Sequence, residues 1–142
     1  MTSELEGLIG GFDFAKALAA KEEDHRANLR ALLIPLLEVM DSFDRLFAFL
    51  EGKPVPEYLE TVRLIARQLE RVLNGAGATP VGSLGKAAEP GKHEILDVRD
   101  AAGVEEGLIV EEVERAYEWD GELLRKARVI VAGDPVKFRK ES

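Results

Sequence analysis

The chain has 142 residues, a mass of 15.6 kDa and a formal net charge of −8, a size that suits one domain or two small ones. A sequence pI of about 4.9 argues against nucleic acid as a partner, because binding to phosphates needs clustered Lys and Arg. The absence of cysteine excludes disulfides, thiol nucleophiles and zinc–thiolate sites.

Residues 1–28 do not resemble a secretory signal peptide, because acidic residues interrupt their apolar positions and no basic segment leads them. No run in the chain approaches the roughly 18 apolar residues that mark a membrane span. We therefore expect a soluble, cytoplasmic protein without a membrane partner. Gly7, Gly10 and Gly11 weaken helix formation, so we expect only a short helix in this segment, such as residues 14–30.

A heptad pattern that begins at Leu29 predicts the first long helix. Its apolar positions alternate between spacings of four and three residues, which is the pattern of helices packed side by side. The positions that we predict to form a dimer interface are Leu29, Leu33, Leu36, Met40, Phe43, Phe47 and Leu50. Pro35 lies inside this stripe and predicts a kink or a helix junction, because an interior proline removes one hydrogen bond.

A second amphipathic helix is predicted after the helix-breaking residues 51–56, from Tyr58 to a stop at Asn74 and Gly75. Two such helices cannot enclose a core alone, and an apolar stripe left in water is unfavourable. We therefore predict that residues 29–77 form a homodimeric four-helix bundle. The alternative is that the apolar stripes pack only against the C-terminal half of the chain.

The composition then changes to turns and strands, which predicts a small all-β domain over residues 78–134. Its clearest feature is a pair of alternating arms on either side of Asp120 and Gly121. This dipeptide is typical of a type I′ hairpin, because both central residues of that turn need positive φ. The first arm is acidic and the return arm is basic, so we expect charge pairs across the two strands.

The predicted fold class is α+β: N-terminal helices that form a dimeric bundle, followed by the small β domain. In the return arm, alternation places three residues on one face: Ala127, Val129 and Val131. The predicted domains are a short helical segment over residues 1–28, the bundle over 29–77, the β domain over 78–134, and a basic tail over 135–142.

His93 lies in the stretch EPGKHEIL, residues 89–96, and is one of two histidines in the chain. A catalytic histidine needs a nucleophile or an orienting partner, and a metal site needs several ligands. Glu94 is adjacent, so on a strand it points to the opposite face, and His25 lies in a charged stretch far away in the sequence. We therefore predict a structural or hydrogen-bonding role for His93, with no catalytic residues, metal or cofactor.

Three stretches, taken in order, carry a resemblance to a known family. The stretch LLIPLLEVMDSFDRL, residues 32–46, resembles the LLPVLDNLERAL signature of GrpE-family nucleotide exchange factors. The EPGKHEIL stretch, residues 89–96, resembles that family's DPNxHEA loop. The stretch LIVEEVERAYEWDGELLRKARVIVA, residues 108–132, resembles its closing motif. The likeness runs from about residue 29 to residue 132.

The resemblance implies a homodimer built on a four-helix bundle, with two small β domains projecting as wings. It implies binding to the nucleotide-binding domain of a DnaK-type chaperone, whose lobes the factor wedges apart so that ADP leaves. The factor itself is not an enzyme, because the chaperone performs the hydrolysis. Members of the family usually carry a long paired helix ahead of the bundle, so residues 1–28 are expected to be a shortened stalk.

The resemblance also implies which residues contact the chaperone. The exposed apolar contacts of the family's wing align with Val113 and Val131, and Arg125 matches the family's arginine. A basic residue after the hairpin glycine aligns with Glu122, which reverses the charge. A second hypothesis is therefore a dimeric scaffold or adaptor that keeps the fold but has lost or altered exchange activity. A third hypothesis, an enzyme or metal protein, has the least support from the residues.

Overall fold

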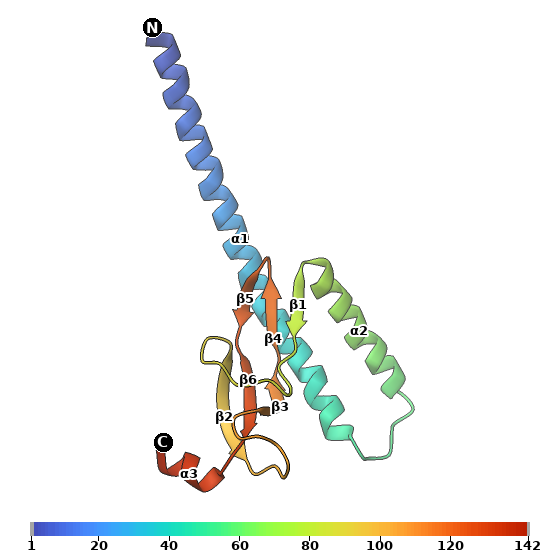
Figure 1. The fold of residues 1–142 in the computed structure, drawn as a ribbon. Helices are drawn as coiled ribbons and strands as arrows, with labels where there is room; N and C mark the ends of the chain where they lie inside the picture. The colour runs from blue at the N-terminus through green and yellow to red at the C-terminus, as the bar shows by residue number, and fades with distance from the viewer. Residues whose placement is uncertain (1, 142) are drawn as a thin grey trace. The chain divides into compact units, whose positions relative to one another are not determined.

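The computed structural model describes the backbone of residues 2–141 and the side chains of residues 13–139. Within these residues, two helices are followed by six short strands and a short C-terminal helix (Figure 1). This order of elements confirms the α+β class. The chain divides into two compact units, Met1–Pro35 and Leu36–Ser142.

Helix α1 runs from Thr2 to Leu50 without a break, over 49 residues. The expectation of a short helix over residues 14–30 is therefore wrong, since glycine costs only about 1 kcal/mol in a helix interior and does not stop a long helix. The helix junction expected at Pro35 is also wrong. Proline has a φ close to the helical value and removes only one hydrogen bond, so the helix continues through it.

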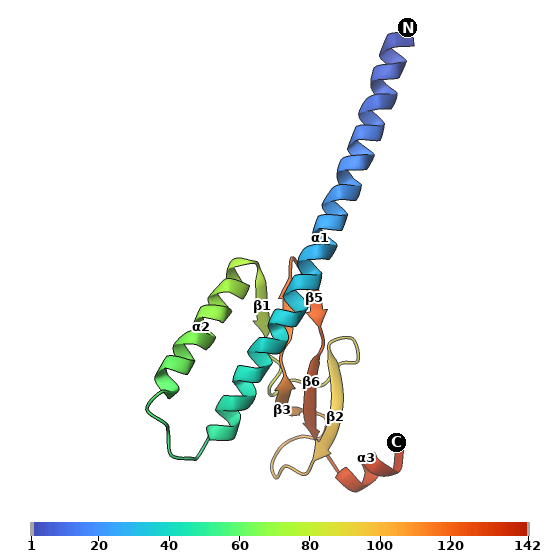
Figure 2. The same cartoon turned by 180° about the vertical axis from the view of Figure 1, so that it is seen from behind.

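Helix α2, Leu59–Gly75, lies antiparallel to the last turns of α1, as Figures 1 and 2 show. It extends to the predicted stop, and the backbone turns at Gly77, whose φ is +91°. One face of α2 is buried within the chain through Leu59, Ala66 and Leu73. This spacing of seven residues is the apolar stripe of an amphipathic helix.

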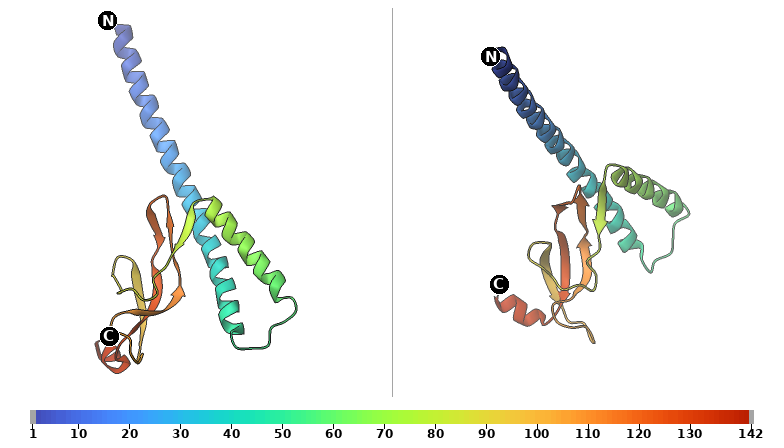
Figure 3. Two further views of the ribbon diagram at one scale, coloured as in Figure 1. Left: turned by 45° about the vertical axis from the view of Figure 1, so that its right-hand side comes forward. Right: turned by 45° about the horizontal axis from the view of Figure 1, so that its top comes forward.

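Six short strands form the β domain, residues 78–134, which we call the wing. The strands are β1 (Ala78–Val81), β2 (His93–Arg99), β3 (Ile109–Glu114), β4 (Ala116–Trp119), β5 (Glu122–Arg125) and β6 (Ala127–Ala132). They form two three-stranded sheets, ordered β1-β4-β5 and β2-β6-β3 (Figure 3). All neighbouring pairs are antiparallel except β2 and β6, which are parallel.

Each of the two predicted arms contributes a strand to both sheets. The first arm changes sheet at Arg115, between β3 and β4, and the return arm changes sheet at Lys126, between β5 and β6. The hairpin between them has the predicted turn, since Asp120 has φ +52° and Gly121 has φ +77°. A predicted cross-strand charge pair is present between Glu114 and Arg128, at 3.6 Å.

The core of the wing lies on one face of β6. Its buried members are Ile109, Ala116, Ala127, Val129 and Val131. The residues that alternation placed together on the return arm are therefore the buried ones, and Arg128 and Ile130 between them are partly exposed. Burial of such apolar side chains contributes most of the stability of a small β domain.

Residues 135–141 form a short helix, α3 (Pro135–Glu141), where a basic tail was expected. Asp134 precedes this helix, and its Oδ1 accepts a hydrogen bond from the backbone N–H of Val136 at 3.0 Å. Phe138 of α3 and Val98 of β2 both line a hollow of about 240 Å³ at this end of the wing. Among the described helices, none combines the length and the apolar character that crossing a membrane requires.

Candidate functional site

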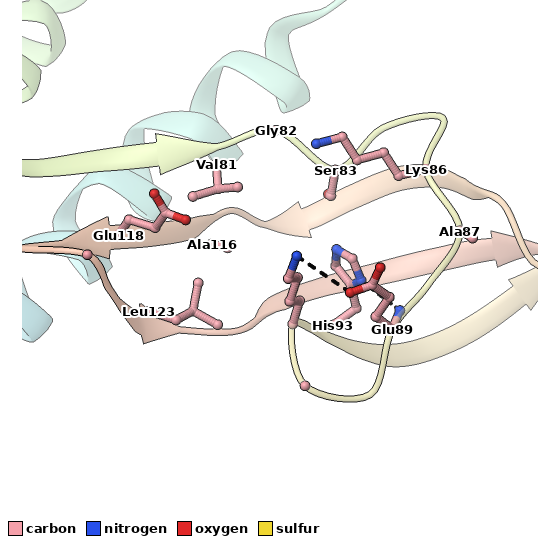
Figure 4. A pocket seen from close by; sticks show the side chains of 13 residues that line it. Val81, Gly82, Ser83, Lys86, Ala87, Glu89, His93, Ala116, Glu118 and Leu123 are labelled. Carbon is pink, nitrogen blue, oxygen red and sulfur yellow. Dashed lines mark hydrogen bonds and ion pairs between the residues drawn. The ribbon is translucent and has the colours of Figure 1, made fainter.

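The wing holds a cavity of about 640 Å³ beside the β4–β5 hairpin (Figure 4). Apolar side chains of Val81, Ala116 and Leu123 line it, together with charged side chains that include Lys86 and Glu118. The cavity therefore combines an apolar surface with charges of both signs. Ser83 also lines the cavity, and its hydroxyl donates a hydrogen bond of 2.6 Å to Oε2 of Glu112.

His93 lies at the edge of this cavity and has a structural role. The Nδ1 atom of His93 accepts a hydrogen bond from the backbone N–H of Glu89 at 2.9 Å. The backbone N–H of His93 donates to the backbone carbonyl of Glu89 at 2.8 Å. Lys92 pairs with the Glu89 carboxylate at 3.5 Å (Figure 4). These bonds close the loop ahead of β2, which confirms the hydrogen-bonding role predicted for His93. Within the described residues, no group of three His, Asp or Glu side chains could hold a metal ion.

A buried ion pair joins α1 to the end of β5. Nη1 and Nη2 of Arg125 each donate to one carboxylate oxygen of Asp41, and both distances are 2.6 Å. The side chain of Asp41 is 6% exposed and that of Arg125 is 17% exposed. A bidentate guanidinium–carboxylate pair fixes direction as well as distance. Removing either partner would leave a buried charge unpaired, which costs about 3 to 5 kcal/mol.

A second pair lies one helical turn further along α1. Nη2 of Arg115 donates to Oδ2 of Asp44 at 2.9 Å, and Nε of the same guanidinium donates to that oxygen at 3.2 Å. The two pairs are linked, because Nε of Arg125 donates to the Arg115 carbonyl at 2.8 Å. We call Asp41, Asp44, Arg115 and Arg125 the arginine clamp.

The Tyr117 ring lies close to both guanidinium groups of the clamp. Its centroid is 5.8 Å from Cζ of Arg115 and 5.4 Å from Cζ of Arg125, within the range of cation–π contacts. Burial raises the pKa of Tyr117 above its ordinary value. Burial by itself lowers the pKa of Arg125, but its hydrogen bonds and its attraction to Asp41 outweigh this effect and raise the pKa.

The sequence model of the family described as GrpE matches residues 14–133. The chain belongs to the GrpE family. A protein GrpE from Thermotoga petrophila is 33% identical over 110 residues, covering 78% of this chain and 62% of that protein. A protein GrpE from Prochlorococcus marinus (strain MIT 9211) is 30% identical over 139 residues, covering 95% of this chain and 56% of that protein.

A protein GrpE from Gloeobacter violaceus is 31% identical over 131 residues, which cover 88% of this chain and 66% of that protein. The chain therefore spans between 56% and 66% of the length of these three relatives. The matched residues include the later part of α1, all of α2 and all six strands of the wing. The match thus covers the arginine clamp and the hairpin as well as the helices.

The chaperone contacts expected from the GrpE resemblance differ in exposure. Val113, on the edge strand β3, is 44% exposed, and Glu122 at the hairpin is also exposed. Val131 is 5% exposed within the wing core, so the expectation that its side chain is a surface contact is wrong. It faces inward because it shares the buried face of β6 with Ala127 and Val129. Arg125 is turned inward as well, toward Asp41.

The predicted dimer-interface residues divide into three groups by exposure. Leu33 and Met40 are buried, at 6% and 3% exposed, and Leu29 is 39% exposed; Leu36, Phe43, Phe47 and Leu50 are partly exposed. Phe47 and Leu50 line a hollow of about 430 Å³ together with Leu59 and Arg63 of α2. This part of the predicted stripe therefore already packs toward α2 of the same chain. Whether it also contacts a second chain stays a prediction.

The structure reveals other apolar side chains on the helices that the interface prediction did not include. They are exposed in the single chain: Val39, Leu46 and Phe49 on α1, and Leu64, Ile65 and Val72 on α2. The clamp carboxylates were also missed. One signal could have pointed to Asp41, since it follows directly on the apolar run that ends at Met40. A carboxylate beside a buried helix face needs a partner, and an arginine supplies the best bidentate one.

Proposed function

We propose that this chain is an adenine-nucleotide exchange factor that binds the nucleotide-binding domain of a cytoplasmic DnaK-type chaperone and promotes ADP release. The observation that carries the proposal is the GrpE-family match over residues 14–133, which includes both the helices and the wing. In this proposal the chain is not an enzyme and needs no cofactor, because hydrolysis belongs to the chaperone.

The physical basis of such exchange is a difference in affinity. A protein that binds the open chaperone more tightly than the closed, ADP-bound one shifts the equilibrium toward the open form. The shift cannot exceed this difference in binding free energy. Contacts made only with the open chaperone therefore matter more than the total area of contact.

We place the chaperone contact on the exposed surface of the wing. Val113 supplies apolar area on β3, and Glu122 supplies a negative charge at the hairpin. β3 lies at the edge of its sheet and pairs only with β6 among the described strands, while the loop residues Gly85 and Lys86 bond to its first residue, Ile109. Val131 and Arg125 lie beneath this surface and are not proposed as contacts.

We also propose a homodimer. Exposed apolar side chains lie on both α1 and α2, and among them Ile65 and Val72 are 50% and 57% exposed. Large exposed apolar patches are rare on monomers and mark interfaces. Packing of the two hairpins from two chains would give the four-helix bundle that the heptad pattern predicts.

A dimeric scaffold or adaptor without exchange activity is the second candidate. It is favoured by Glu122, which places a carboxylate where the family's pattern has a basic residue. Reversing one charge at an interface rim changes partner choice more than it changes the fold. The two candidates make different predictions about nucleotide-dependent binding.

The test is the affinity of the chain for a DnaK-type chaperone from the same source, measured by titration calorimetry in two nucleotide states. We expect tighter binding to the nucleotide-free chaperone than to the ADP-loaded one, by about fivefold or more. By linkage, ADP should then bind the complex more weakly by the same factor. Equal affinities in the two states would contradict exchange activity and favour the scaffold.

A further inference from the structure

The arginine clamp brings together charged side chains that are far apart in the sequence. Arg115 is separated from Asp44 by 71 residues, and Arg125 is separated from Asp41 by 84 residues. Both carboxylates come from α1, and both guanidinium groups come from the strand ends of the wing. The clamp therefore joins the helical part of residues 36–142 to its β part.

The geometry of the clamp restricts the rotation of the wing relative to α1 as well as its separation from α1. Each guanidinium is a planar fork that makes at least two hydrogen bonds to one carboxylate. Because Asp41 and Asp44 are three residues apart on a helix, they present two attachment points on one face of α1. Two bidentate pairs on one helix face define an angle between the helix and the strands, which a single apolar contact does not.

The environment of the clamp adds to this restriction. Asp41 is 5% exposed and Tyr117 is 2% exposed, whereas the side chains of Arg115 and Asp44 are 29% and 38% exposed. Movement that separates Arg125 from Asp41 would therefore leave a buried charge without water or a partner. Arg125 is also held by the Arg115 carbonyl, so three of its nitrogen atoms are already bonded within the chain.

We propose that the arginine clamp fixes the angle at which the wing is held on α1, and that Arg125 is a positioning residue for chaperone binding rather than a contact. The second part rests on the proposed exchange function. The clamp orients the surface that carries Val113 relative to the helices. Arg125 thus acts on the chaperone through the position of the wing.

The angle can be followed through the distance between a label on α1 and a label on the wing. The chain has no cysteine, so introduced cysteines can be labelled selectively. We would place spin labels at Glu38→Cys on α1 and Glu118→Cys on β4, both exposed positions. Labelled protein would be mixed with an excess of unlabelled protein, so that each dimer carries at most one labelled chain. Pulsed electron–electron double resonance then gives the distribution of distances between the label on the helix and the label on the wing.

Two variants test the clamp. Arg125→Ala removes the main pair, and the double variant Asp41→Leu with Arg125→Met replaces it by apolar side chains. When apolar side chains replace a buried ion pair, the protein often stays as stable or becomes more stable. The apolar side chains do not, however, fix a direction as the hydrogen bonds of the pair do. The control is Arg128→Ala, because Arg128 pairs with Glu94 and Glu114 inside the wing and is 42% exposed.

We expect a single narrow distance peak in the unsubstituted protein and in Arg128→Ala, and its loss in both clamp variants. The double variant should recover the thermal stability that Arg125→Ala loses. Its acceleration of ADP release should nevertheless be smaller than that of the unsubstituted protein by a factor of about five or more. This split between stability and exchange is what a merely structural role for Arg125 would not produce.

Two results would overturn the proposal: an unchanged narrow peak in the clamp variants, or full exchange activity in the double variant once its stability is restored. Failure of the proposed function can be recognised separately. In that case the unsubstituted protein would not accelerate ADP release at all. The distance distributions would then decide the role of the clamp, since loss of the peak supports it and an unchanged peak contradicts it.

Discussion

At the scale of single residues, a buried tyrosine lies close to two paired guanidinium groups. Tyr117 is 2% exposed, and its ring centroid is 5.8 Å and 5.4 Å from the guanidinium carbons of Arg115 and Arg125. Each guanidinium is paired with a carboxylate of α1, so the cluster is close to neutral as a whole. Because burial raises the pKa of Tyr117, the stability of the fold depends on pH in a defined way.

The raised pKa of Tyr117 predicts a loss of stability in alkali. The folded protein keeps the phenol proton at a pH where the unfolded chain, whose Tyr pKa is about 10, releases it. The stabilisation is therefore complete below about pH 10 and is lost as pH rises through the higher folded value. The loss is about 1.4 kcal/mol for each unit between the two pKa values.

The measurement is the free energy of unfolding of the unsubstituted protein and of Tyr117→Phe from about pH 8 to about pH 11.5, a range that includes the ordinary Tyr pKa. The Phe variant lacks the titrating hydroxyl but keeps the ring, so the difference between the two proteins should be constant below about pH 10 and change above it. A difference that is independent of pH across the whole range would contradict the argument.

Val113 and Val131 are a matched pair for separating contact from packing, since one is 44% exposed and the other 5%. Val131→Asp buries a carboxylate without a partner and should destabilise the wing by about 3 to 5 kcal/mol. Val113→Asp should change stability by less than about 0.5 kcal/mol and weaken binding to the chaperone about fivefold or more.

Thermal unfolding by circular dichroism and the chaperone titration give the two readouts for this pair. A stable Val131→Asp protein would show that the core assignment is wrong. Unchanged chaperone affinity in Val113→Asp would remove β3 from the proposed contact surface.

At the scale of elements, local periodicity predicted the type of the two longer helices and of both arms but not their partners, and it did not predict α3. The alternation of the return arm correctly grouped Ala127, Val129 and Val131, yet alternation does not say which face is buried. The change of sheet at Arg115 and at Lys126 was not predicted, because alternation along each arm does not show that a strand is interrupted and continues in another sheet. The heptad on α1 likewise gave a stripe without showing that part of it faces α2.

The exposed row on α2 gives a prediction for this scale. Ile65→Asp places a carboxylate among the apolar side chains that we propose to be covered by a second chain, so it should shift the dimer toward monomer. Arg67→Asp introduces the same carboxylate at an exposed position two residues away, which lies on another face of the helix. Sedimentation equilibrium at several concentrations measures the effect.

We expect the dissociation constant of the dimer to rise at least about 100-fold in Ile65→Asp and to change little in Arg67→Asp. If both variants remain dimeric with equal affinity, then the exposed row of α2 is not the interface. If the unsubstituted protein is a monomer at all concentrations, then the bundle itself is excluded.

At the scale of the whole molecule, the order of parts predicted more than any single motif. Helices, a turn-rich segment and a β domain with a closing hairpin indicate the family from the sequence alone, and residues 14–133 match it. The candidate site was predicted less well. Aligning motifs shows which residues correspond to family positions, but it does not show in which direction their side chains point. Arg125 and Val131 both correspond to family positions, and both point into the chain.

The central claim, that the chain promotes nucleotide exchange, is tested most directly by stopped-flow release of a fluorescent ADP analogue from a DnaK-type chaperone of the same source. We expect the release rate to rise with the concentration of the chain and to saturate as the complex becomes fully formed. The control is a second exchange factor that confirms the chaperone is responsive. An unchanged release rate, with the chain folded and this control positive, would contradict the claim and favour the scaffold.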